Sequence, residues 1–167
     1  MLIILEGWDG AGKTTLAKLL HSVLDESEII HCTSETPNDE EFFKKIISAA
    51  HQRHIIADRF CYGQYVYQEQ DDRPLTFYKA KDGTIETWEG EYEGLHNLEA
   101  YMLNQHVPVK LIYVYSDPKT IAERLEKRGE AVEDFNGWDA EDLARIGMES
   151  YEKLWKQTLI QPIYYKT

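Results

Sequence analysis

The sequence predicts an α/β fold of three layers, in which a five-stranded parallel sheet is flanked by helices. Short, continuously apolar runs recur along the chain, and segments with helical periodicity lie between several of them. The length of 167 residues matches the usual size of one domain. We therefore expect one hydrophobic core and one domain over residues 1–167.

Five apolar runs are the predicted strands. The first covers residues 1–5 and is followed at once by glycines, as is typical of a strand buried on both faces of a sheet. The others cover residues 29–32, 54–57, 109–115 and 159–165. Helical patterns between several of these runs suit the crossovers that parallel strands require.

Four segments have the periodicity of amphipathic helices. The first begins at Lys13, with apolar residues at steps of three and four: Leu16, Leu19, Leu20, Val23 and Leu24. The others cover residues 39–51, 118–128 and 139–157, and we expect Asp117 and Asp139 to cap the last two.

Residues 75–92 have a different pattern. Two runs that favour β-structure flank Asp82-Gly83, which is a strong local signal for a hairpin turn. We expect an inserted β-hairpin here, projecting from the sheet.

The composition excludes several classes of protein. Hydrophobic residues make up 43% of the chain, which is too many for a disordered protein. The formal net charge of −12 argues against broad binding to nucleic acid. No apolar run approaches the roughly 20 residues that cross a bilayer. With only Cys32 and Cys61 and no leader-like segment, we expect a cytoplasmic protein that does not bind membranes.

The strongest motif is the segment from Gly7 to Thr14, which fits G-x-x-x-x-G-K-[ST] at every fixed position. A loop of small residues turns its backbone amides toward phosphate oxygens at the positive end of the next helix. Lys13 would bridge the outer phosphates, and the Thr14 hydroxyl would bind Mg²⁺. The alternative, a glycine turn that binds nothing, rarely lies between a strand and a helix.

This motif predicts the P-loop NTPase form of the α/β fold. The residues expected to bind the nucleotide through the loop are Gly7, Asp9, Gly10, Ala11, Gly12, Lys13, Thr14 and Thr15.

A second candidate group, Asp58 and Arg59, follows the predicted strand over 54–57 directly. Ligand sites of α/β sheets lie at the carboxyl ends of strands. Asp58 would hold Mg²⁺ through water, and Arg59 would grip an acceptor phosphate. An ordinary surface ion pair is the alternative, and the neighbouring phosphate loop favours the functional interpretation.

Arg124 and Arg128 lie four residues apart on one helix face. One would stack on adenine and the other would reach phosphates. Because Glu123, Glu126 and Glu130 are close in sequence, solvated ion pairs are the alternative.

Taken together, these segments resemble the thymidylate kinase family of P-loop nucleoside monophosphate kinases. The stretch from Leu5 to Thr15, with an acid two residues after its first glycine, is close to the family's opening. Asp58-Arg59-Phe60 followed by Tyr67-Gln68 is similar to its Asp-Arg-Tyr block. The basic stretch from Arg124 to Gly129 is similar to the entry of its lid, and Tyr151 matches a tyrosine of its closing helix.

The resemblance implies ATP-dependent phosphoryl transfer, with Mg²⁺, to a small-molecule acceptor, a deoxynucleoside monophosphate. Asp9 would then lie near the acceptor sugar and phosphates, and Arg59 would hold the acceptor phosphate. Since the loop has Gly10 and Ala11 rather than an arginine, a lid over residues 129–137 would supply the catalytic cation, for which Arg128 is the candidate.

The departures from the family concern the acceptor. Gly63 stands where a serine is usual, and about twenty residues separate Pro37 from Asp58, too few for the family's two helices. In the family the missing helix carries the aromatic residue and the arginine that recognise thymine, so these departures leave thymine specificity open. The resemblance implies dTMP, dUMP or a modified pyrimidine nucleotide as the acceptor. Aromatic residues of the hairpin would rebuild the wall around the base, and packing of these residues on their own sheet is the alternative.

Three other functions stay open from the sequence. One is a nucleoside kinase, with Glu35 or Asp9 as the general base. Another is a kinase of a modified base or nucleotide within DNA, against which the net charge argues. The third is a non-catalytic nucleotide-binding switch. The sequence leaves the oligomeric state open as well, a homodimer included.

Overall fold

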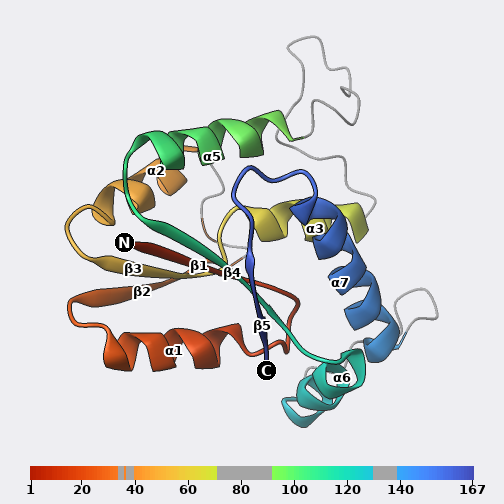
Figure 1. The fold of residues 1–167 in the computed structure, drawn as a ribbon. Helices are drawn as coiled ribbons and strands as arrows, with labels where there is room; N and C mark the ends of the chain where they lie inside the picture. The colour runs from red at the N-terminus through yellow and green to blue at the C-terminus, as the bar shows by residue number, and fades with distance from the viewer. Residues whose placement is uncertain (34–35, 37–39, 71–91, 130–138) are drawn as a thin grey trace.

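The computed structural model describes residues 1–33, 36, 40–70, 92–129 and 139–167. In these residues five parallel strands form one sheet in the order β2-β3-β1-β4-β5 (Figure 1). Their bounds are Leu2–Glu6 (β1), Ser27–His31 (β2), His54–Asp58 (β3), Val109–Tyr115 (β4) and Ile163–Lys166 (β5). The prediction of a five-stranded parallel sheet is confirmed.

The centre of the sheet is β1, which pairs with β3 on one side and with β4 on the other. All five of its residues are buried, as expected for a strand with helices over both faces. Leu5 is in register with Asp58, and His31 of β2 is in register with Asp58 on the other side of β3. The carboxyl ends of three strands therefore meet at one edge, which is where α/β sheets bind ligands.

Six helices are described, on both sides of this sheet. Their bounds are Lys13–Val23 (α1), Glu40–Ala49 (α2), Tyr62–Gln70 (α3), Glu93–Asn104 (α5), Pro118–Lys127 (α6) and Ala140–Trp155 (α7). Figure 1 shows α1 on one side of the sheet and α2 and α5 on the opposite side. The described residues thus have the three-layer arrangement that was predicted.

The sequence analysis missed two helices, α3 and α5. The α3 segment contains three tyrosines, a valine and Gly63, which are residue types of low helix propensity. The α5 segment does have a helical pattern, because Leu95, Leu98 and Met102 are all buried. That spacing is a signal that could have predicted α5.

Two predicted elements differ in detail from the structure. The last strand starts at Ile163 rather than at 159, because the backbone amides of Leu159 and Ile160 donate to Glu99 instead of to a neighbouring strand. On α1, Leu16 is buried, but Leu19 and Val23 are 57% and 68% exposed. The apolar stripe predicted for this helix is therefore wider than the face it buries.

The two predicted helix caps have opposite outcomes. Asp139 precedes α7, and its Oδ1 accepts a hydrogen bond from the amide of Asp142 at 2.8 Å, so this cap is confirmed. Asp117 precedes α6 but makes no capping hydrogen bond. Its carboxylate accepts from Lys166 Nζ at 3.0 Å instead, so the prediction of an Asp117 cap is wrong.

Two predicted segments lie outside the described residues. They are the hairpin over 75–92, of which only Tyr92 is described, and the lid over 129–137, of which only Gly129 is described. Among the described helices, none has the length and hydropathy of a membrane span.

Candidate functional site

The loop from Gly7 to Gly12 connects β1 to α1, and two of its glycines are required by the backbone geometry. Gly7 has φ 145°, and a Cβ there would lie 2.0 Å from the carbonyl oxygen of Val114. Gly12 precedes α1 with φ 101°, a left-handed conformation that side chains rarely adopt. The loop can therefore turn tightly at both ends, as a phosphate-binding loop requires.

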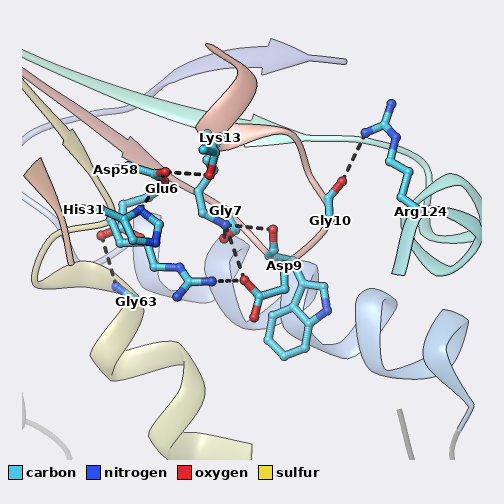
Figure 2. A network of polar contacts seen from close by, with 12 residues as sticks. Glu6, Gly7, Asp9, Gly10, Lys13, His31, Asp58, Gly63 and Arg124 are labelled. Atoms are coloured by element: carbon cyan, nitrogen blue, oxygen red, sulfur yellow. Dashed lines mark hydrogen bonds and ion pairs between the residues drawn. The ribbon is translucent and has the colours of Figure 1, made fainter. Parts of the chain in front are cut away.

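Lys13 is folded back over this loop. Its Nζ donates to the carbonyl oxygens of Gly7 at 2.7 Å and Trp8 at 3.0 Å, and lies 3.8 Å from Asp9 Oδ1. Burial lowers the pKa of Lys13 to about 8, and Asp9 partly opposes this shift. Figure 2 shows the ammonium group among the loop atoms, so the loop holds a buried positive charge.

The two residues predicted to hold a metal are in contact. The Thr14 hydroxyl donates to Asp58 Oδ2 at 2.7 Å, and the Asp58 side chain is buried. Asp58 Oδ1 is shielded from solvent and has no hydrogen-bond partner among the described residues. A hydroxyl and a free carboxylate oxygen are hard oxygen donors of the kind that Mg²⁺ prefers, so the residues fit this ion.

Among the described residues, no group of three or more His, Cys, Asp or Glu side chains could hold a metal ion. At phosphate sites Mg²⁺ usually has one or two protein oxygens as ligands, together with phosphate oxygens and water.

Asp9 and Arg59 face one another across the mouth of the loop. Arg59 follows β3, and its guanidinium forms an ion pair with Asp9 Oδ1 (Figure 2). The backbone of Arg59 has φ 70°, an uncommon conformation for a residue with a side chain. Non-glycine residues in such conformations concentrate at functional sites. The structure therefore brings together Asp9, Lys13, Thr14, Asp58 and Arg59.

Glu6 is a site residue that the sequence analysis used only as part of a motif. It is completely buried at the end of β1, and Oε1 accepts from the amides of Phe60 at 2.8 Å and Gly63 at 3.3 Å. Its Oε2 accepts from the Tyr151 hydroxyl at 3.1 Å. Burial raises the pKa of Glu6, while the Phe60 amide and Lys13 oppose this. The signal for Glu6 in the sequence was an acidic residue directly after the apolar run over residues 1–5.

Arg124 binds the outer side of the loop. Its Nη1 donates to the carbonyl oxygen of Gly10 at 3.2 Å and to Thr167 Oγ1 at 2.9 Å (Figure 2). Thr167 Oγ1 in turn donates to the carbonyl oxygen of Ala11 at 2.9 Å. Thr167 was not among the predicted site residues, and nothing in its local sequence pointed to the loop. Stacking of either Arg124 or Arg128 on adenine stays a prediction.

The remaining predicted residues also lie near the loop. Arg128 is the exposed residue that ends α6, and its Nε donates to the carbonyl oxygen of Arg124. The amide of Ala11 donates to the carbonyl oxygen of Trp8 at 3.1 Å, and Thr15 is exposed on the first turn of α1.

A cavity of about 770 Å³ lies over the loop and contains most of these groups. Its lining residues are Asp9, Gly10, Gly12, Lys13, Thr14, Thr15, Leu16, Leu19, His31, Asp58, Arg59, Arg124, Lys127, Arg128, Tyr165 and Thr167. Five of them are cationic, although the whole chain carries a charge of −12. The cavity therefore has the charge and the size to take a phosphorylated ligand such as a nucleotide.

Trp8 fixes the loop against α3 and α7. Its ring stacks on Tyr67 with centroids 4.8 Å apart, and it also lies against Gly147 of α7. A Cβ at Gly147 would lie 2.1 Å from Trp8 Cε3, closer than atoms can approach. Glycine disfavours a helix, and the space that the Trp8 indole needs explains why this residue type is found at position 147.

Comparisons with known proteins agree with this fold. No protein-family model matches the chain. The chain is 29% identical over 150 residues to the "SPbeta prophage-derived uncharacterized protein YorR" of Bacillus subtilis strain 168. That alignment covers 89% of this chain and 80% of YorR.

Three solved structures have the same fold. YorR from Bacillus subtilis, in complex with phosphorylated GDP, has a TM-score of 0.65 at 24% identity, covering 99% of this chain and 85% of YorR. Polyphosphate kinase 2 from Arthrobacter aurescens TC1 has a TM-score of 0.61 at 17% identity, covering 99% of this chain and 60% of that protein.

The third structure is deoxyadenosine kinase from M. mycoides with bound dCTP, with a TM-score of 0.52 at 18% identity. That match covers 100% of this chain and 89% of the kinase. The predicted fold class, a parallel α/β sheet shared with P-loop kinases, is confirmed. These likenesses do not single out the thymidylate kinase branch.

Proposed function

We propose that this protein is an ATP-dependent kinase that transfers a phosphoryl group to a deoxynucleoside monophosphate and releases the diphosphate. One observation carries the proposal: Lys13, Arg59 and the hydrogen-bonded Thr14–Asp58 pair line one cavity, and Lys13 and Arg59 both contact Asp9 Oδ1. Phosphoryl transfer depends mainly on positioning and on charge stabilisation, and these groups can supply both.

On the donor side, the loop amides and Lys13 bind the phosphates of ATP. The Lys13 ammonium exchanges the carbonyl oxygens of Gly7 and Trp8 for phosphate oxygens. Thr14 and Asp58 hold Mg²⁺, which neutralises the charge that develops on the phosphates during transfer. Arg128, exposed at the end of α6, adds positive charge near the transferred group.

On the acceptor side, Arg59 binds the phosphate that attacks. A guanidinium recognises phosphate through two parallel hydrogen bonds, and Asp9 keeps Arg59 at the loop until the acceptor arrives. An acceptor phosphate is already an anionic nucleophile at neutral pH, so the reaction requires no strong general base.

The proposed acceptor is dTMP, dUMP or a modified pyrimidine nucleotide. Its nucleotide character has support from YorR, whose structure holds phosphorylated GDP, and from a deoxyadenosine kinase of the same fold. The pyrimidine base rests on the resemblance to thymidylate kinases alone.

A second candidate is a nucleoside kinase, which phosphorylates a hydroxyl and needs a carboxylate base. The Asp9 carboxylate favours it, because this side chain is 41% exposed at the cavity. Glu35, the other predicted base, lies outside the described residues.

Chromatography of the reaction products tests both functions. ATP, GTP and polyphosphate would each be offered as donors with Mg²⁺, and deoxynucleosides, deoxynucleoside monophosphates and oligonucleotides as acceptors. We expect ADP and a deoxynucleoside diphosphate from ATP and a pyrimidine monophosphate. Lys13→Ala should lower this rate by about 100- to 1,000-fold, while circular dichroism shows an intact fold.

Transfer only to deoxynucleosides would establish the nucleoside kinase instead. Binding of ATP without transfer to any acceptor would contradict both proposals and would favour a nucleotide-binding switch.

A further inference from the structure

His31 contacts the carboxylate that we assign to the metal site. It is the last residue of β2, in register with Asp58 at the end of β3, so the two side chains emerge next to one another (Figure 2). His31 Nδ1 lies 2.9 Å from Asp58 Oδ2. His31 also lines the cavity, and half of its side chain is exposed there.

The two oxygens of Asp58 have unequal surroundings. Oδ2 is bonded to both His31 Nδ1 and the Thr14 hydroxyl, whereas Oδ1 is buried and has no partner in the described part of the chain. Because a carboxylate can only accept, the hydrogen of this bond belongs to His31 Nδ1. Two donors on one oxygen fix the orientation of the carboxylate.

We propose that His31 is a positioning residue, which holds the Asp58 carboxylate beside Thr14, where it can bind the water shell of the Mg²⁺ ion. The inference rests on the proposed function, because it gives Asp58 the same role. Carboxyl groups rotate readily about their last bond, and a ligand held in one orientation loses less freedom on binding. Neighbours that orient metal ligands typically change metal affinity or activity by about 10- to 100-fold.

Thr14 cannot fulfil this role alone. Its hydroxyl is itself a proposed ligand, so its own geometry changes with the ion, whereas His31 is attached to a different strand. If His31 only stabilised the pairing of β2 with β3, its replacement would lower the stability of the protein and leave its affinity for the metal ion unchanged.

Titration with Mn²⁺, followed by electron paramagnetic resonance in the presence of ADP, tests the inference without turnover. We expect His31→Leu to weaken Mn²⁺ binding by about 10- to 100-fold. His31→Asn keeps an N–H donor near the position of Nδ1 and should recover most of this loss. His21→Leu is the matched control, since His21 is bonded to Ser27 on the outside of the protein.

Two results would overturn the inference. One is wild-type Mn²⁺ affinity in folded His31→Leu. The other is an equal loss in both His31 variants together with a fall in the unfolding temperature, which would indicate a structural role. A wild-type protein that binds Mn²⁺ and ADP but phosphorylates no acceptor would contradict the proposed function alone, because this titration does not depend on catalysis.

Discussion

Arg59 and Asp9 form an ion pair at the cavity over the loop. The backbone of Arg59 has φ 70°, and its amide donates to the carbonyl oxygen of Leu5 at 3.0 Å. The bond to β1 holds Arg59 in this conformation, which turns the chain away from the sheet. The side chain is therefore placed by the backbone as well as by Asp9.

Arg59→Ala should impair acceptor use in particular. A hydrogen bond to a charged group contributes about 1.5 to 3 kcal/mol, so kcat/KM for the acceptor should fall roughly 10- to 150-fold. Steady-state kinetics with each substrate varied in turn would measure this. The KM for ATP should change little, and Arg145→Ala, at an exposed arginine of α7, is the control. Normal acceptor kinetics in Arg59→Ala would remove Arg59 from this role.

Lys13 should make the stability of the protein depend on alkaline pH. Burial lowers its pKa from 10.5 to about 8, while the unfolded lysine keeps its proton to about 10.5. Between these values the unfolded state binds more protons, so the free energy of unfolding rises with pH. Below pH 8 both states are protonated, and the cost of burying the charge is fully present. Between pH 8 and about pH 10.5, the free energy of unfolding should therefore rise by about 3 kcal/mol.

Lys13→Met removes this dependence but retains the ionisation of other groups. Urea unfolding of both proteins at pH 7, 8, 9 and 10 would measure the difference between their unfolding free energies. The advantage of the variant should be largest at pH 7 and should shrink above pH 8. A difference that stays constant from pH 7 to pH 10 would show that the pKa of Lys13 is not lowered.

At the scale of elements, α7 contains a residue that is unfavourable for the helix itself but leaves room for Trp8 of the loop. Glycine is the worst helix former after proline, yet Gly147 lies in the middle of α7. The indole of Trp8 occupies the space where a side chain would be. Periodicity within α7 could not predict this, because the reason lies in a residue far away in the sequence.

Gly147→Ala should therefore destabilise the protein, although alanine favours helices. Overpacking costs about 1 to 3 kcal/mol and exceeds the gain in helix propensity of about 1 kcal/mol. In a Trp8→Leu background the same substitution should be neutral or stabilising. Denaturant unfolding of the four proteins in this double-mutant cycle measures the coupling, and equal effects in both backgrounds would contradict the proposed contact.

The two helix-start aspartates provide a matched pair. Asp139→Ala removes the cap of α7 and should cost about 1 kcal/mol in unfolding free energy. Asp117→Ala removes only an exposed ion pair with Lys166 and should cost a few tenths of a kcal/mol. Chemical denaturation would compare the two variants, and a larger loss at Asp117 would contradict the assignment of the caps.

At the scale of the whole molecule, the sequence predicted the sheet well because its strands are continuous apolar runs. The glycine-rich loop could be predicted for a related reason, since its motif is a fixed order of small residues in the chain. Glu6, Tyr151 and Thr167 meet at the loop from distant parts of the sequence. Such contacts follow from the packing of α7 and β5 against the loop, which no local pattern encodes.

The charge distribution predicts an unusual response to salt. The molecule has a formal net charge of −12, and repulsion between its negative charges destabilises the compact state. Raising NaCl from 20 to 200 mM at neutral pH screens this repulsion, and a gain of about 1 kcal/mol would raise the unfolding temperature by about 2 to 4 °C. Differential scanning fluorimetry would measure the shift.

The same salt series at pH 5 is the control for this prediction. The isoelectric point is near 4.9, so little net repulsion is left to screen there and the shift should vanish. An unfolding temperature that falls with salt at neutral pH would mean that attractive ion pairs outweigh the repulsion.

The central position of β1 has a consequence for synthesis on the ribosome. Gly7 turns against Val114 of β4, and β1 pairs with β4 along its length. More than a hundred residues must therefore be translated before the loop after β1 can reach its final shape, which takes about 5 to 20 s at ordinary elongation rates. During that interval the apolar segment of β1 lacks the β4 partner beside which it is buried in the folded protein.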